Sequence, residues 1–256
     1  SLKTDVKFAG EENLLTEVSI DGGKEYLGPF PSEEKVEGVD TNKSALAVSG
    51  GGGGRVPRWW VEGALLAGTE PLAETTTTVA PFKLLLTQEK DSVEIGTVEC
   101  SEVKLHGAQI EAPSGRSEKD VEYAGCKVLE PHSAVENAKC EVQDRAIVTN
   151  ELQATLEGPL KHEKLEFKPK AGKELGSFFI IGAGCSFAGE FKADGDMVCG
   201  YPKVEEEKVE HVLEFTGTSG SDVTLAGPDG IGTNPTDGVT VTYEDHLASH
   251  KLYSAF

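Results

Sequence analysis

Apolar and polar residues alternate along most of the chain with the period of two that is typical of β-strands. The alternation is clear at residues 152–156, where leucine and alanine alternate with glutamine and threonine. Other strand-like runs cover residues 16–20, 75–79, 82–86, 93–98, 103–110, 121–129, 165–167, 187–191, 209–215, 223–226 and 239–243. Frequent short strands with turn residues between them are typical of β-sandwiches and barrels. The pattern predicts an all-β fold of antiparallel β-sandwich or barrel-like domains.

A run of five glycines, Gly50 to Gly54, divides the chain. Because glycine loses the most backbone entropy on ordering, the run predicts a flexible linker or a tight crossing beneath the bulky Trp59-Trp60 pair. We expect an N-terminal β-rich arm or small subdomain at residues 1–49, a Gly-rich linker at 50–58 and a main β domain at 59–256. Within the arm, Asp21-Gly22-Gly23 follows a strand pattern and predicts a hairpin.

The charge of the chain restricts its partners. The 44 acidic and 24 basic residues give a formal net charge of −20, which repels nucleic-acid phosphates and anionic lipid surfaces. The excess acid is explained by a well-hydrated surface, or alternatively by cation binding or a negatively lined channel. No apolar run reaches the ~18 residues that a membrane-spanning helix needs. We therefore expect no nucleic-acid partner and no transmembrane segment.

Five cysteines lie in or beside strand-like runs, and none has the spacing of metal ligands: Cys100, Cys126, Cys140, Cys185 and Cys199. Cysteines in such positions predict disulfide staples and an oxidising compartment, so we expect a secreted, extracellular or cell-surface protein. The first residue, Ser1, fits a mature chain after removal of a signal peptide, or alternatively a trimmed one. Because five is odd, at least one thiol stays outside any intrachain bridge.

The pairing of these cysteines is open from sequence. A bridge between Cys126 and Cys140 would close a ~15-residue loop, which is worth roughly 3 kcal/mol in the chain-entropy model. Cys185 and Cys199 bracket a similar loop, around the Asp194-Gly195 turn. Alternatively, Cys100 pairs with Cys185 and ties early strands to late ones.

The sequence contains few candidates for chemistry. Gly182-Ala183-Gly184-Cys185 resembles a nucleophile turn but lacks the required final glycine, and we interpret it as a kink before a disulfide. Asp194-Gly195-Asp196 resembles part of a calcium loop, and we interpret it as a hairpin turn. His246 and His250 would share a face if they lay on a helix. We expect no enzyme activity, no cofactor and no metal; a secreted hydrolase that uses unidentified carboxylates is the alternative.

Several short segments carry a resemblance: Trp59-Trp60-Val61-Glu62-Gly63, Val98-Glu99-Cys100, Ala124-Gly125-Cys126, Thr149-Asn150-Glu151-Leu152 and Gly184-Cys185. Together they resemble a group of uncharacterised, secreted, β-rich, cysteine-containing proteins of soil actinobacteria. The similarity spans residues 59–202, and it implies export but no reaction. Cys199 and the region before Trp59 depart from the pattern of that group, which leaves the bridges open.

These observations predict an extracellular, non-enzymatic structural or surface protein that self-assembles into a homopolymer. Its N-terminal arm would add a strand to an open sheet edge of a neighbouring copy. One alternative is a carbohydrate or cell-wall binding module in which exposed Trp59 and Trp60 stack against a glycan. Another is a phage tail or capsid-decoration protein.

Overall fold

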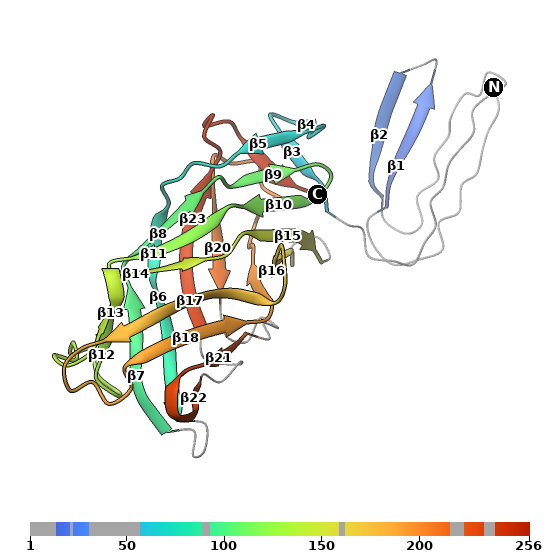
Figure 1. The fold of residues 1–256 in the computed structure, drawn as a ribbon. Coiled ribbons are helices and arrows are strands. Elements are labelled where there is room, and N and C mark those ends of the chain that lie inside the picture. Colours follow the sequence, from blue (N-terminus) through green and yellow to red (C-terminus); the bar gives the residue numbers. More distant parts are fainter. Residues whose placement is uncertain are drawn as a thin grey trace. The chain divides into compact units, whose positions relative to one another are not determined.

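The computed structural model describes residues 14–20, 23–30, 57–88, 93–158, 162–215, 223–232 and 239–256. The chain divides into two compact units, Ser1–Gly53 and Gly54–Phe256, so the division falls within the glycine run. In the N-terminal unit, β1 (Leu14–Ile20) and β2 (Gly23–Phe30) form an antiparallel hairpin, as the sequence pattern predicts (Figure 1). The predicted turn residues Asp21 and Gly22 lie outside the described residues.

The C-terminal unit is built almost entirely of antiparallel strands, which confirms the predicted all-β class. One ladder of paired strands runs in the order β5 (Thr69–Pro71), β9 (Gln109–Glu111), β10 (Gly115–Glu118), β15 (Leu152–Glu157), β16 (Lys164–Pro169), β19 (Met197–Gly200), β20 (Glu210–Phe215) and β23 (Val239–His246). An isolated bridge between Leu72 and Leu247 brings the two ends of this first ladder together.

A second ladder runs in the order β8 (Glu102–His106), β11 (Asp120–Ala124), β14 (Ala146–Thr149), β17 (Glu174–Ile181), β18 (Gly189–Asp194), β21 (Thr224–Ala226), β22 (Ile231–Gly232) and β6 (Thr77–Gln88). Strand β6 also pairs with β7 (Val93–Cys100), which pairs with β12 (Lys127–Leu129), and β13 (Glu141–Val142) pairs with β17. Pairing of β6 with β23 joins the two ladders, so the strands enclose a common interior.

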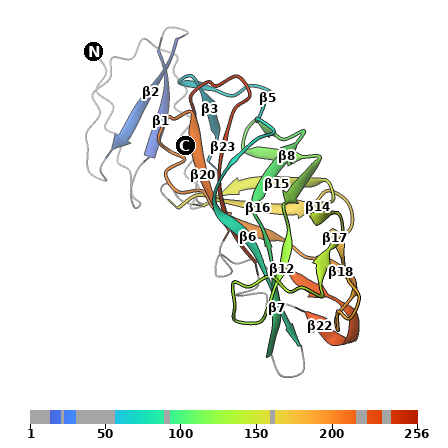
Figure 2. The same cartoon turned by 90° about the vertical axis from the view of Figure 1, so that its left-hand side faces the viewer.

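A small third sheet lies against one end of this structure. It consists of β24 (Tyr253–Ala255), β3 (Trp59–Val61) and β4 (Ala64–Leu65). Both views place β3 near β5 (Figures 1 and 2). The backbone N–H of Trp59 donates to the carbonyl oxygen of Pro113 at 2.9 Å, which ties the small sheet to the turn before β10. Two short 3₁₀ turns, Gln143–Arg145 and Pro228–Gly230, complete the unit.

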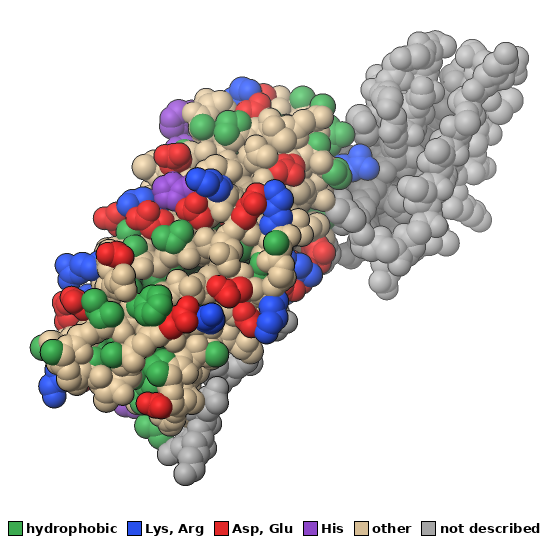
Figure 3. Space-filling model, in the orientation of Figure 1, with side chains coloured by type: hydrophobic (Ala, Val, Ile, Leu, Met, Phe, Trp, Pro, Cys, Tyr) green, Lys and Arg blue, Asp and Glu red, His purple; other side chains and the backbone are tan. Residues whose placement is uncertain are grey.

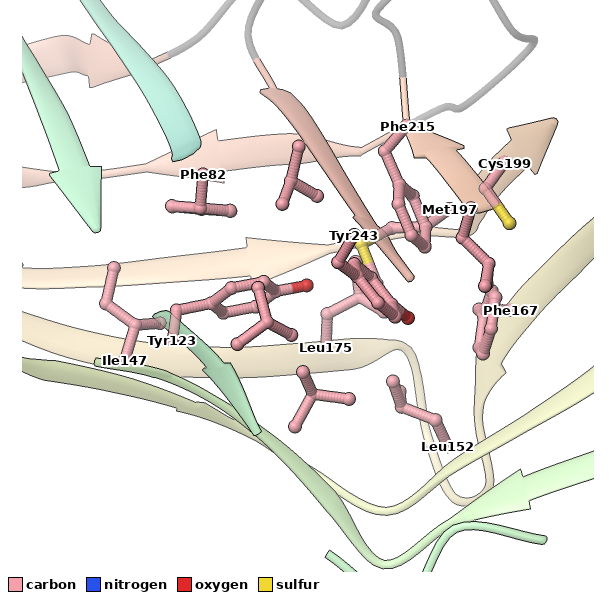
Figure 4. Close-up of a cluster of buried hydrophobic side chains, with 14 of the residues drawn as sticks. Phe82, Tyr123, Ile147, Leu152, Phe167, Leu175, Met197, Cys199, Phe215 and Tyr243 are labelled. Atoms are coloured by element: carbon pink, nitrogen blue, oxygen red, sulfur yellow. The ribbon is translucent and has the colours of Figure 1, made fainter. Parts of the chain in front are cut away.

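The core lies between the two ladders. On β15, Leu152, Ala154 and Leu156 are buried and the residues between them are exposed, as the alternation predicts. Aromatic side chains of both ladders point into the shared interior in Figure 4, including Phe82, Tyr123, Phe167, Phe215 and Tyr243. The rings of Phe82 and Tyr123 stack with centroids 4.2 Å apart. Burial of these large apolar side chains is the main source of stability.

The outer surface carries acidic and basic side chains side by side on the face shown in Figure 3. Many of them pair across neighbouring strands, for example Lys104 with Glu122 at 2.9 Å and Lys83 with Glu99 at 3.3 Å. Exposed pairs of this kind contribute about 0–1 kcal/mol each, so they decide little of the fold. No helix within the described residues is long and apolar enough to cross a membrane.

Candidate functional site

The most unusual chemical feature of the C-terminal unit is a group of charged side chains inside it. Arg116, Glu118 and Asp245 are each at most 1% exposed. Tyr201 and Tyr253 are also fully buried and are hydrogen-bonded to Asp245. Buried charges are costly unless they are paired and hydrogen-bonded, so the contacts of each group decide what this buried cluster can do.

Arg116 is the centre of the buried cluster. Its Nε and Nη2 atoms both donate to Oε1 of Glu118, at 2.9 and 2.7 Å. Its Nη1 atom donates to Oδ2 of Asp245 at 2.5 Å. The guanidinium carbon also lies 5.5 Å from the centre of the Phe167 ring, within the range of a cation–π contact. One cation therefore partners two carboxylates.

Asp245 accepts further hydrogen bonds on its other oxygen. The hydroxyls of Tyr253 and Tyr201 donate to Oδ1 at 2.7 and 3.0 Å. His211 lies beside Tyr253, and its Nε2 donates to the Tyr253 carbonyl oxygen at 2.8 Å. Both oxygens of Asp245 are thus satisfied. In contrast, Oε2 of Glu118 is buried and has no hydrogen-bond partner among the described residues.

The strand period explains how these polar residues come to lie inside. Arg116 and Glu118 are two residues apart on β10, so both point to the buried face of that strand. Asp245 follows Val241 and Tyr243 at the same spacing on β23, and all three are buried. The sequence signal for this cluster is a charged residue at a position that the strand alternation assigns to the buried face. The strand pattern does not reveal this signal, because residues 115–118 contain no apolar alternation.

Burial changes the proton affinities of the buried cluster. Desolvation raises the pKa of Glu118, and the Arg116 charge offsets this only in part. Desolvation also acts to lower the pKa of Arg116, but the charges of Glu118 and Asp245 hold it well above its ordinary value. Loss of water raises the pKa of both Tyr201 and Tyr253, so their hydroxyls stay protonated as hydrogen-bond donors.

The five cysteines form two bridges that differ from the predicted ones. Cys100 pairs with Cys126, Cys140 pairs with Cys185, and Cys199 is a buried free thiol. The predicted pairs Cys126–Cys140, Cys185–Cys199 and Cys100–Cys185 are therefore wrong. The prediction that one thiol is left over is confirmed.

Strand register explains the observed bridges. Glu99 on β7 lies opposite Lys127 on β12, and Glu102 on β8 lies opposite Ala124 on β11, so Cys100 and Cys126 face each other between these pairs. Their Cα atoms are 3.9 Å apart. Gly125 is needed at this crossing because its φ of 65° favours glycine and a Cβ would collide with Ser101.

The second bridge follows from the pairing of β13 with β17. Glu141 lies opposite Ile181, which brings Cys140 to the end of β17. The chain then turns through Gly182 and Gly184, both with positive φ, and places Cys185 against Cys140. The interpretation of this segment as a glycine-dependent turn before a disulfide is confirmed. Cys199, on β19, faces the interior instead, and burial raises the pKa of its thiol.

The tryptophans do not form the predicted exposed platform. Trp59 is completely buried, and its Nε1 donates to the carbonyl oxygen of Gly115 at 2.7 Å. Its ring lies against Tyr201 and Tyr253, with centroids 6.0 and 6.4 Å away. The prediction for Trp59 as a ligand-stacking residue is wrong, because neighbouring strand residues point to opposite faces and Trp59 takes the inner one. Trp60 is partly buried on the outer face.

The remaining motifs lie apart from the buried cluster. The chain between Asp194 and Asp196 passes from β18 to β19, which do not pair with each other, so the predicted hairpin turn is instead a crossing between ladders. Residues 253–255 form a strand, and His246 and His250 stack with ring centroids 5.0 Å apart. Among the described residues, no three His, Cys, Asp or Glu side chains are placed to hold a metal ion.

An apolar cavity of about 50 Å³ lies between the ladders and is lined by residues that include Phe82, Tyr123, Leu175, Met197 and Leu225. Ligand pockets are typically about 300–1,000 Å³, so this void is too small for an ordinary substrate. Apolar voids of this kind stay dry. The cavity is best understood as a gap in the packing of the core.

The buried cluster is therefore suited to holding strands together and to binding a proton, since its reactive atoms are shielded from solvent. The contact between Arg116 and Asp245 connects β10 with β23 in the first ladder, and the hydrogen bond from Tyr253 connects the small sheet to Asp245.

Comparison of the chain with protein-family models, with curated proteins and with solved structures gives no match.

Proposed function

We propose that this chain is an extracellular, non-enzymatic structural or surface protein that associates with copies of itself through the β1–β2 hairpin. The observation that carries the proposal is the contrast between the two units. In the C-terminal unit the ladders close on themselves. In the N-terminal unit the described residues pair β1 and β2 only with each other, and the outer edge of a strand is a template for a further strand.

A two-stranded hairpin is marginally stable in water, and a third strand or a packed partner adds the missing stability. Strand addition from a second copy supplies backbone hydrogen bonds of the same kind as those within the hairpin. The two disulfides of the C-terminal unit support an oxidising, extracellular setting, which is also what the resemblance to secreted actinobacterial proteins implies.

The net charge of −20 opposes close approach of identical chains. Salt screens such repulsion, with a Debye length of about 10 Å at 0.1 M ionic strength and 3 Å at 1 M. Association through the hairpin should therefore increase with ionic strength.

The test compares two matched variants of the full chain by sedimentation velocity and negative-stain electron microscopy. Val18→Lys puts a charge at the centre of β1, where lysine protects strand edges from pairing. Val79→Lys makes the same change at an exposed position of β6 in the closed unit. We expect association of the wild type and of Val79→Lys, and loss of association for Val18→Lys. A monomeric wild type at every salt concentration, or equal association of both variants, would refute the proposal.

A second candidate function is glycan binding, favoured by one observation. Trp60 lies edge-on to Phe256 with ring centroids 6.1 Å apart, and Phe256 is 41% exposed. Partly exposed aromatic rings offer apolar faces to sugars. Both tryptophans of the chain lie on β3, so tryptophan fluorescence reports on this surface. An unchanged emission spectrum across a panel of cell-wall glycans would exclude this function.

A further inference from the structure

We propose that Glu118 carries a proton in the folded protein over a pH range in which it is ionised in the unfolded chain, and that this proton secures the β3–β4–β24 sheet against the barrel end. Glu118 would then act as a proton-dependent latch inside the C-terminal unit. The inference is independent of the self-association proposed above.

The buried cluster contains more acidic groups than basic groups. Glu118 and Asp245 provide two carboxylates, and Arg116 provides one guanidinium; all three are at most 1% exposed. With both acids ionised, the cluster holds one uncompensated negative charge away from water. A buried, uncompensated charge has a high desolvation free energy, and protonation of one of the two acids removes it.

Hydrogen bonding decides which of the two acids takes the proton. Both oxygens of Asp245 already accept hydrogen bonds, one from Arg116 and the other from Tyr201 and Tyr253. Glu118 accepts two bonds from Arg116 on Oε1 alone, and its Oε2 has no partner among the described residues. Protonation of Glu118 on Oε2 therefore breaks no hydrogen bond among the described residues.

Within the described part of the chain, the surroundings of Glu118 add no second cation. Besides Arg116, the titratable groups that interact with it are Asp245 and Tyr243 of β23, Tyr123 of β11 and Cys199 of β19. Burial raises the pKa of Tyr123, Tyr243 and Cys199, which keeps them uncharged. In the same direction, desolvation raises the pKa of Glu118 above its ordinary value of 4.5.

The raised pKa of Glu118 fixes how the stability of the fold should change with pH. Since the pKa of Glu118 is higher in the folded state, its stabilising contribution is complete below pH 4.5 and is lost as the pH rises through the folded value. His211, beside Tyr253, acts oppositely: burial lowers its pKa below 6.5, so its contribution is lost as the pH falls. The two groups can therefore be told apart by the sign of the slope.

The small sheet is the element that should respond. Tyr253 of β24 donates to Asp245, and Trp59 of β3 packs against Tyr253 and Tyr201. When Glu118 ionises, the uncompensated charge favours entry of water at this end of the barrel. The only two tryptophans of the chain, Trp59 and Trp60, lie on β3 and report on that change by fluorescence.

The test measures urea unfolding and native-state tryptophan emission of the full chain between pH 4.5 and 8.5. For the wild type we expect the unfolding equilibrium constant to rise with pH, by at most tenfold per pH unit for one proton, together with a red shift of the emission. Glu118→Gln should lack this component, because glutamine mimics the protonated acid. Glu122→Gln, at a partly exposed ion pair with Lys104 on the outer surface, should keep it.

A second variant keeps the inference testable if Glu118→Gln does not fold. Asp245→Asn removes one of the two negative charges and leaves Arg116 to Glu118 alone, so the pH-dependent component should shrink. Infrared spectra of the wild type should also contain the carbonyl band of a protonated, buried carboxyl group above pH 4.5. Parallel pH profiles for the wild type and both variants, or absence of that band, would overturn the inference.

Discussion

Replacing Arg116 with methionine removes the guanidinium that partners both buried carboxylates. Three hydrogen bonds are lost, two to Glu118 and one to Asp245, while the methionine side chain keeps apolar contact in the direction of Phe167. Removing one partner from a buried ion pair typically costs about 3–5 kcal/mol, because the remaining charges stay buried without compensation. We expect a loss of that size in the free energy of unfolding at pH 7.

The assay is urea unfolding followed by tryptophan fluorescence, since both tryptophans lie in the C-terminal unit. With an m-value of about 3 kcal/mol per molar urea, the midpoint should fall by roughly 1–1.7 M. The matched control is Lys104→Met, which removes a cation from a partly exposed surface pair with Glu122 and should cost about 0–1 kcal/mol. The loss for Arg116→Met should shrink at acid pH, where protonation removes the carboxylate charges. Equal losses for the two variants would refute the reasoning.

Four further outcomes are expected. Non-reducing peptide mapping should find Cys100 joined to Cys126 and Cys140 joined to Cys185, and a Cys126–Cys140 peptide would contradict the register argument. Removing these bridges singly should cost about 3.5 and about 4 kcal/mol in the chain-entropy model, for separations of 26 and 45 residues, measured by chemical denaturation. Cys199 should react with a thiol reagent only after unfolding, because burial raises its pKa and blocks access; rapid labelling of the native protein would contradict this. Gly227→Ala should destabilise the fold by about 1–3 kcal/mol through overpacking, seen as a lower melting temperature, since a Cβ there overlaps the Phe191 ring. In Gly68→Ala the new Cβ meets open space, so the melting temperature should change little.

The strands could be predicted from sequence because their signal is local. The alternation at residues 152–156 reflects one buried and one exposed face of a single strand, and nothing distant is needed to recognise it. The strand predicted at residues 209–215 is likewise confirmed, since β20 covers Glu210–Phe215.

The disulfides could not be predicted in the same way, because they depend on which strands lie side by side. Cys126 and Cys140 are close in sequence, but Cys126 is opposite Cys100 through the pairing of β7 with β12. Sequence spacing left the local pair open as one of several candidates. The register between paired strands, which sequence spacing does not encode, decided against it.

The functional residues were missed for a related reason. Trp59 and Trp60 look equivalent in sequence, and only the burial of β3 on one side separates a core side chain from a partly exposed one. Arg116 and Glu118 look like ordinary surface charges, because neither has apolar neighbours in the chain. Their role becomes visible only when Asp245, 129 residues beyond Arg116, lies against them.

The buried cluster connects segments of the C-terminal unit that are far apart in the sequence. Asp245 joins Arg116 of β10 to Tyr253 of β24, and Tyr253 supports Trp59 at the start of the unit. Contacts between such distant segments form only after a large loop-closure entropy has been met, so they add stability once most of the barrel is in place. The pairing of β6 with β23 joins the two ladders, and the bridge between Leu72 and Leu247 closes the first one, so loss of the buried cluster would loosen this closure and the small sheet together. The unit should therefore unfold as one cooperative block, with the buried cluster and the small sheet lost in the same transition.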